Sequence, residues 1–421
     1  MPSWILYALA AVGSFTAGTV LAAPSVDTYP LDTGFSFGAV ETSGITASAT
    51  GALVAASIAL WLRHRVGALG AVVAGAALVA VVALPGAWRF DMYVSAVGAG
   101  LVLGALVVCC ARTAGTRLPA VMTGGVVAAL LTAEPVAEYR EFAASSSGSA
   151  VYLEVSAQPA NTVWTVLSVT VIAVATAALV MRAGAPDSVD ERRWDVRETV
   201  VGIGLPLVAV VLYRSLHSAV WSPDASPGGN GRWLWGIVAV PLVIGAALWL
   251  RERSGAVLLA AFAVAVAAGT APSWIPGGWF LPAVMVVLAA VGAWLGRRAP
   301  RPTAGVGVLA FVTITAIFTR APWDNVHLLA TFFVLPVAAA YTISAALPST
   351  SAVTAASFSL PAVMALPLLT RFGWTAYTPL TDSPSGWTPD SWTVLTTGVS
   401  VAGVLAAGAA MWWIGRRSEV L

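Results

Sequence analysis

Charged residues are scarce in this chain of 421 residues. Asp, Glu, Lys and Arg together make up 10% of it, whereas an ordinary soluble domain contains about 25%. Lysine is absent, so all 21 basic residues are arginine, and the formal net charge is only +2. So few charges cannot cover the surface of a water-soluble chain of this length. Soluble enzymes, soluble nucleic-acid-binding proteins and disordered chains are therefore excluded.

Cysteine and histidine are also rare, which limits the chemistry of any site. Cys109 and Cys110 are adjacent within an apolar run. Neighbouring residues of a helix point in different directions, so we expect no disulfide between them. The three histidines, His64, His217 and His327, lack the spacing of metal ligands. Nucleotide-binding and hydrolase motifs are missing too. We expect no metal, no cofactor and no nucleic-acid partner.

Apolar residues dominate instead, at 58% of the chain, with a mean hydropathy of +0.86. About 20 helical residues cross roughly 30 Å of hydrocarbon. About 14 apolar runs of this length follow one another, which predicts an all-α polytopic membrane protein partnered by the lipid bilayer. The predicted spans are 4–24, 45–63, 67–86, 92–112, 118–134, 160–181, 199–216, 233–250, 255–272, 279–296, 303–319, 326–347, 350–369 and 392–414.

The arginine positions predict an orientation. With the N-terminus inside, 15 arginines fall in inner segments and 6 in outer ones, as the positive-inside rule requires. We therefore expect both termini in the cytoplasm. No basic residue precedes the apolar run 5–23, which favours a first span over a cleaved signal. A composition rich in alanine and without lysine is typical of a GC-rich bacterium, so the expected location is a bacterial plasma membrane.

Two short matches indicate an internal duplication. Residues 59–68 agree with 247–256 at eight of ten positions, an offset of 188. A weaker match relates 164–168 to 392–396, an offset of 228. These matches predict two parallel six-helix repeats with an extra hairpin inserted in the second half, within 303–369.

The same reasoning divides the chain into domains. We expect an N-terminal transmembrane bundle (1–181), a cytoplasmic linker (182–198) and a C-terminal transmembrane bundle (199–421). The pentamer Leu-Pro-Ala-Val-Met also recurs, and it is interpreted as chance similarity because its copies fall in helices of opposite predicted direction. Its copies lie at 118–122, 281–285 and 360–364.

The turns within the longer match resemble a turn of the major facilitator superfamily. Arg65-Val66-Gly67 and Arg253-Ser254-Gly255 correspond to the Arg-x-Gly of that family's turn, whereas His64 and Glu252 stand at its aspartate position. The resemblance implies alternating access by rocking of two bundles around a central site. The gating-turn residues it implies are Arg63, Arg65, Gly67, Arg251, Arg253 and Gly255.

Arginines on the predicted outer side are the candidate substrate-binding residues. The arginine fork suits phosphate or carboxylate oxygens, so a shared outer vestibule would attract a small-molecule or lipid-linked anion. The alternative is that each arginine reaches the interface alone or pairs with a local acid. The candidates are Arg89, Asp91, Arg214, His217, Arg320, His327 and Arg371.

Small hydroxyl residues and glycines gather in the first two predicted spans. They permit close packing of helices, and packing is favoured over the alternative, a polar path. The residues are Ser14, Thr16, Thr19, Ser43, Thr46, Ser48, Thr50 and Ser57, with Gly13, Gly18, Gly44 and Gly51.

The repeat favours a transporter over an enzyme. The first hypothesis is a secondary carrier that works by alternating access, with its substrate left open. The second is a flippase for an anionic lipid-linked glycolipid intermediate. The third is a polytopic glycosyltransferase using a polyprenyl-phosphate sugar, with Asp27, Asp32 or Glu41 as its acid, although the large outer domain of such enzymes is missing. A non-catalytic subunit of a larger assembly is the fourth.

Overall fold

The structure is a computed structural model in which twelve helical rods are described. The described residues are 3–22, 44–62, 65–82, 91–111, 118–145, 196–220, 234–250, 253–271, 280–318, 323–347, 389 and 391–420. Within the N-terminal part the rods are α1 (Ser3–Ala22), α3 (Gly44–Trp61), α4 (Arg65–Val82), α5 (Asp91–Ala111) and α6 (Leu118–Ser145). They continue with α8 (Val196–Val220), α9 (Leu234–Trp249), α10 (Arg253–Ala268), α11 (Phe280–Arg298), α12 (Pro302–Thr315), the composite rod α13 (Asp324–Leu329), η2 (Ala330–Val334) and α14 (Leu335–Ala346), and α16 (Ser391–Val420).

Twelve of the predicted spans coincide with these rods, which confirms the all-helical class. The predicted spans 160–181 and 350–369 lie outside the described residues, so the total of 14 stays a prediction. Helix α8 begins at Val196, inside the range predicted as a linker. Four described segments are long and apolar enough to cross a membrane, namely Asp91–Val108, Phe280–Arg298, Asp324–Ala346 and Thr393–Arg417.

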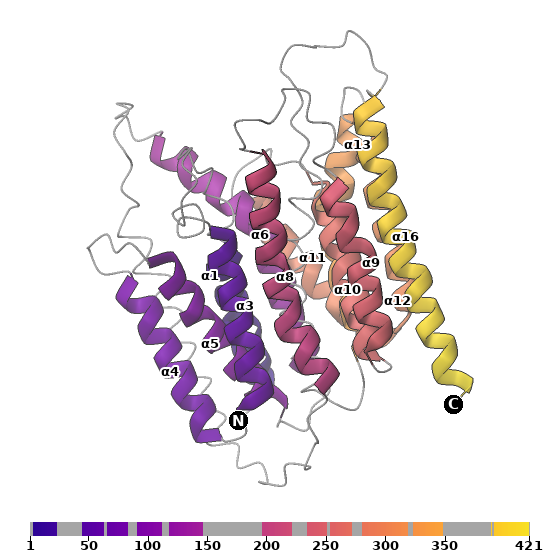
Figure 1. Cartoon of the computed structure of the whole chain (residues 1–421). Coiled ribbons are helices and arrows are strands. Elements are labelled where there is room, and N and C mark those ends of the chain that lie inside the picture. The colour runs from indigo at the N-terminus through magenta and orange to yellow at the C-terminus, as the bar shows by residue number, and fades with distance from the viewer. Residues whose placement is uncertain are drawn as a thin grey trace.

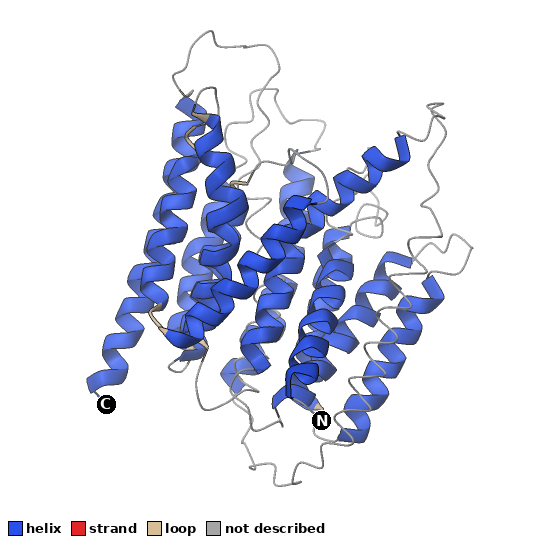
Figure 2. Cartoon of the chain, turned by 180° about the vertical axis from the view of Figure 1, so that it is seen from behind, coloured by secondary structure: helices blue, strands red, loops and turns tan. Residues whose placement is uncertain are grey.

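Most of the rods stand side by side in one bundle (Figure 1). The described N- and C-terminal ends lie at the same end of it, which we call the terminal end. Helix α13 lies at the opposite end, called the far end here. The view from behind shows helices throughout the described part of the chain (Figure 2).

Glycine permits the closest helix contacts of the N-terminal half. A Cβ at Gly51 of α3 would lie 2.6 Å from the Ala96 carbonyl oxygen of α5, and one at Gly100 would lie 2.3 Å from the Gly51 oxygen. The buried Ser48 hydroxyl donates a 2.5 Å hydrogen bond to the Leu21 carbonyl oxygen of α1. Ser14 likewise bonds a carbonyl oxygen of its own helix. These contacts favour the packing role predicted for the small residues of the first two spans.

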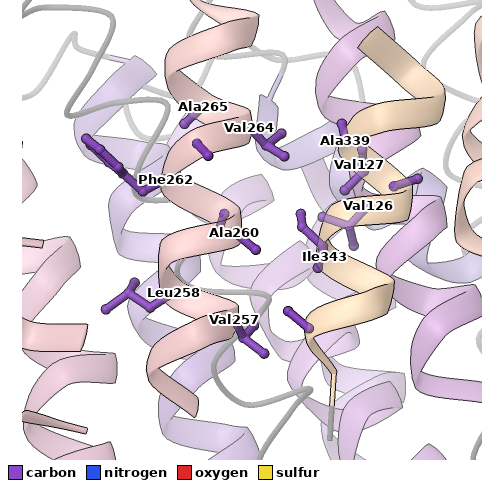
Figure 3. Packing of buried hydrophobic residues seen from close by; sticks show 14 of the residues in the cluster. Val126, Val127, Val257, Leu258, Ala260, Phe262, Val264, Ala265, Ala339 and Ile343 are labelled. Carbon is purple, nitrogen blue, oxygen red and sulfur yellow. The ribbon is translucent and has the colours of Figure 1, made fainter. Parts of the chain in front are cut away.

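Helix α10 forms the centre of the C-terminal half. Its residues 257–267 are all at least 94% buried, among them Phe262 at 0% exposure. Val257, Ala260 and Val264 point toward α14, which carries Ala339 and Ile343, whereas Leu258 and Phe262 lie on the other side of α10 (Figure 3). Val126 and Val127 of α6 belong to the same buried cluster. A helix that is apolar and buried on every side occupies the interior of a helical assembly. Helix α10 is therefore an inner helix rather than a lipid-facing one.

Close contacts also join α11 to α14. A Cβ at Gly292 would lie 2.2 Å from the Val337 carbonyl oxygen, and one at Gly296 would lie 2.5 Å from the Tyr341 oxygen. The N-terminal rods contact the later ones where α3 packs against α8 and where α6 packs against α11 and α14. Between α6 and α11, a Cβ at Gly124 would lie 3.2 Å from the Cβ of Ala293.

A π-helical turn, η2, interrupts the rod between α13 and α14. Pro336 follows it directly. Proline has no N–H, and its ring clashes with the carbonyl four residues earlier, here that of Phe332. The wider turn relieves this clash, which gives η2 a local cause in the sequence. Such turns are frequent at functional sites.

Tryptophan–arginine pairs mark the terminal end. The guanidinium groups of Arg298, Arg416 and Arg417 lie 5.2, 4.0 and 5.2 Å from the ring centres of tryptophans four residues earlier. At the far end, the Phe318 and Trp323 rings lie 6.3 Å apart. Aromatic residues are enriched at both faces of a bilayer. The two ends of the bundle therefore carry the residues expected at membrane–water interfaces.

The contact at Gly51 yields a stability prediction. Gly51→Ala lowers the free energy of unfolding by about 1–3 kcal/mol, because the added methyl group meets a backbone carbonyl and the Leu21 side chain, 2.2 Å away. The measurement is thermal unfolding of the purified protein in detergent.

The matched control is Gly70→Ala in α4, where an added Cβ meets nothing within 4 Å. It leaves the melting temperature unchanged or raises it, because alanine has the higher helix propensity. Equal destabilisation by both variants would contradict the described α3–α5 contact.

Candidate functional site

His327 is the buried histidine of the described chain and lies where three helices meet at the far end. It belongs to α13 and is 8% exposed. Its partners come from the last turn of α12, at Thr315, and from just beyond the end of α10, at Thr270. One side chain thus joins the ends of two helices to the beginning of a third, a group we call the histidine junction.

Both ring nitrogens of His327 are used within the histidine junction. Nε2 lies 2.9 Å from the Thr270 carbonyl oxygen, and Nδ1 lies 3.0 Å from the Thr315 hydroxyl oxygen. That hydroxyl in turn donates a 2.6 Å hydrogen bond to the Val312 carbonyl oxygen. A carbonyl oxygen can only accept, so Nε2 carries a hydrogen.

A further buried hydroxyl group, that of Thr331, lies one helical turn beyond the histidine junction. Thr331, in η2 and four residues after His327, is 2% exposed, and its hydroxyl has no hydrogen-bond partner. Pro336 cannot donate a backbone hydrogen bond to the Thr331 or Phe332 carbonyls. A wide turn with an unsatisfied buried hydroxyl is a place where a polar ligand or water can bind. Neither Thr315 nor Thr331 was predicted as a site residue, and the Pro336 interruption was the signal available.

The structure describes some of the predicted substrate-binding residues and not others. His327 lies at the histidine junction. Asp91 begins α5, where its carboxylate accepts a 2.8 Å hydrogen bond from the Met92 N–H. Arg214 and His217 lie on α8, but their side chains are outside the described part. Three further candidates, Arg89, Arg320 and Arg371, lie outside the described residues, so a shared arginine vestibule stays a prediction.

The two predicted gating turns begin helices α4 and α10. Arg65 and Arg253 are the first residues of these helices, whereas Arg63 and Arg251 lie outside the described residues. A Cβ at Gly255 would lie 2.1 Å from the Ala247 carbonyl oxygen, but one at Gly67 would meet only the Leu62 side chain, at 2.9 Å. The second turn therefore requires glycine more strictly than the first.

Helix α8 braces the second of these turns at the terminal end. The Arg197 guanidinium donates a 3.1 Å hydrogen bond to the Trp249 carbonyl oxygen and lies 5.9 Å from its ring centre. The Ser254 hydroxyl donates a 3.2 Å hydrogen bond to the Glu198 carboxylate. The beginning of α8 is therefore fixed to the end of α9 and the start of α10.

The described rods form an apolar α-helical bundle in which four segments are long and apolar enough to cross a membrane, and its fold resembles that of major facilitator-type transporters. The structure of a double-tryptophan mutant of the xylose transporter XylE aligns with a TM-score of 0.52 and 14% identity, over 98% of this chain and 95% of that one. The inward-open XylE from E. coli gives 0.48 and 16%, over 98% and 96%. A POT family transporter in complex with a thioalcohol-conjugated peptide gives 0.47 and 14%, over 99% and 95%. No family model and no curated protein matches the chain.

The turn geometry yields a second prediction. Gly255→Ala destabilises the protein by about 1–3 kcal/mol, because the methyl group meets a backbone oxygen that cannot move away alone. Gly67→Ala has a smaller effect, because the Leu62 side chain can change rotamer. Both are compared by thermal unfolding in detergent.

Gly245→Ala is the control on α9, since an added Cβ there meets nothing within 4 Å. A melting temperature for Gly255→Ala as high as that of Gly245→Ala would show that the turn is looser than described.

Proposed function

We propose that the chain is a secondary transporter that carries a small molecule across the membrane by alternating access. The observation that carries this proposal is the likeness in fold to the XylE mutant, with a TM-score of 0.52 over 98% of the chain. Alternating access needs two bundles that rock around a site between them. Contacts among α1, α3, α4 and α5, and among α10, α11, α12 and α14, support such a division, with α6 packed against α11.

The contacts support a particular pairing of the two halves. In the N-terminal half, α5 packs against α1, α3 and α4. In the C-terminal half, α14 packs in the same way against α10, α11 and α12. We therefore pair α1 with α10, α3 with α11, α4 with α12, and α5 with the rod α13–α14. Glycine-mediated approach of backbones occurs in both equivalent pairs, α3–α5 and α11–α14.

This pairing changes the expected position of the inserted hairpin. Helices α8 and α9 have no counterpart in it, so we place the insertion between the halves rather than within 303–369. The match between 164–168 and 392–396 then relates equivalent last helices. The pentamers at 118–122 and 360–364 also fall in predicted helices that this pairing treats as equivalent, but at different points along them, which accords with chance similarity. The longer match between 59–68 and 247–256 becomes the one that does not relate equivalent helices.

The expectations about orientation, location and substrate remain proposals. Cytoplasmic termini, a bacterial plasma membrane and an anionic substrate rest on the sequence. The flippase and glycosyltransferase alternatives rest on arginines and acids outside the described side chains and stay alternatives, whereas the carrier is supported by the likeness in fold. The common end of the described termini accords with an even number of spans (Figure 1).

Spin-label distances test alternating access without a known substrate. Exposed positions Val81 and Leu329 lie toward the far end on the two halves, and Gly70 and Leu295 lie toward the terminal end. Each pair is changed to cysteine after Cys109→Ala and Cys110→Ala. In proteoliposomes, both pairs show two distance populations, and lengthening at one end accompanies shortening at the other.

The pair Val12 and Val81, both exposed within the N-terminal half, is the control and gives one narrow distance. Single narrow distances for both test pairs, under all solute and pH conditions, would contradict a rocking carrier.

A further inference from the structure

The hydrogen-bond directions around His327 are unusual for a neutral imidazole. The Thr315 hydroxyl has one hydrogen, and the 2.6 Å contact directs it to the Val312 carbonyl oxygen. The Thr315 oxygen then faces Nδ1 at 3.0 Å as an acceptor. Nε2 faces the Thr270 carbonyl, another acceptor. Both ring nitrogens must therefore donate for all three hydrogen bonds to exist together, and only the imidazolium ion has two N–H groups.

Two helix ends favour a positive charge at this position. Thr315 is the last residue of α12, and Thr270 lies two residues beyond the end of α10. Helix C-termini carry partial negative charge, and cations near them are stabilised. The positive N-terminal end of α13 opposes this effect, but Asp324 lies in the first turn of that helix. The acceptor groups and the two helix ends favour the charged ring, whereas the burial of His327 opposes it by removing water from the charge.

We propose that His327 is a proton-binding site that ties the ends of α10 and α12 to the start of α13 when both of its ring nitrogens carry a hydrogen. A hydronium ion from solvent transfers a proton to the Nδ1 lone pair: the N–H bond forms as one hydronium O–H bond breaks, and a water molecule is released. After its release, the Thr315 hydroxyl either turns from Val312 toward Nδ1 or leaves Nδ1 without a partner. Losing the proton therefore loosens the histidine junction at the far end.

The location suits exchange of a proton with solvent. Trp323 and Asn325, four and two residues before His327, are exposed. Among the described residues of the helices that contact His327, Asp324 is the titratable residue at the far end. On the other rods the described charged or titratable side chains lie at the terminal end, as for Arg301 before α12, Arg298 on α11 and Tyr341 on α14. Protonation of His327 can therefore be measured with little interference from those neighbours.

Nitrogen NMR of labelled histidine tests the protonation state directly. The double variant His64→Gln and His217→Gln leaves His327 as the single histidine and keeps the junction intact. On acidification from about pH 8 to pH 5, the range in which histidine titrates, both ring nitrogens become protonated while Nε2 stays hydrogen-bonded. A ring that keeps one hydrogen across this range would overturn the proposal.

Hydrogen exchange tests the mechanical consequence in the full-length protein. After correction for intrinsic rates, backbone protection in 266–271, 313–318 and 324–330 rises about tenfold on acidification. This estimate follows because a hydrogen bond to a charged group contributes about 1.5 kcal/mol or more, and about 1.4 kcal/mol is tenfold. His327→Gln abolishes the rise. Thr315→Val reduces it, because Nδ1 loses its acceptor.

Thr313→Val is the matched control. Thr313 is also fully buried on α12, but its hydroxyl donates to the Leu309 carbonyl oxygen of its own helix. This variant keeps the tenfold rise. An equal rise in His327→Gln, or an equal loss in Thr313→Val and Thr315→Val, would overturn the proposal. None of these outcomes depends on transport, so the proton site and the proposed carrier function can fail separately.

Discussion

Close approach of helix backbones is the constraint on which this architecture depends. Within a bilayer the lipid tails are as apolar as the side chains, so hydrophobic burial gives helices little reason to associate. Van der Waals contact must supply the attraction, and it acts only at short range. Gly51 and Gly100 between α3 and α5, and Gly292 and Gly296 between α11 and α14, allow that contact. The same kind of contact occurs in both helix pairs, which the proposed pairing of the two halves treats as equivalent.

The few polar interactions then distinguish the two ends of the bundle. At the terminal end, arginines lie over tryptophans, and Arg197 and Glu198 of α8 brace the turn before α10. At the far end, His327 joins three helices through groups that all accept hydrogen bonds. The first set joins charged side chains to aromatic rings, to a backbone carbonyl and to a hydroxyl group. The second depends in our proposal on one proton, which makes the histidine junction sensitive to pH.

The helices could be predicted from the sequence because each is a long apolar run, and twelve of the predicted spans coincide with described rods. Their pairing was harder to predict, because local matches such as 59–68 with 247–256 carry no information about packing partners. The histidine junction could not be predicted either. It joins residues 12 and 57 positions apart, and one partner is a backbone carbonyl, which leaves no mark in the sequence. Pro336 signalled only that the rod is interrupted.

The contact between the halves offers the most direct measurement. With Cys109 and Cys110 replaced by alanine, Gly124→Cys and Ala293→Cys place two Cβ atoms close to the separation of a disulfide, since an added Cβ at Gly124 lies 3.2 Å from that of Ala293. Oxidation joins this pair, whereas Gly124→Cys with the exposed Val291→Cys does not react. For this experiment the spin labels at the two test pairs are attached by chemistry that does not react with thiols. If the halves rock across this contact, the disulfide reduces the two distance populations to one. Unchanged populations after complete cross-linking would contradict the account.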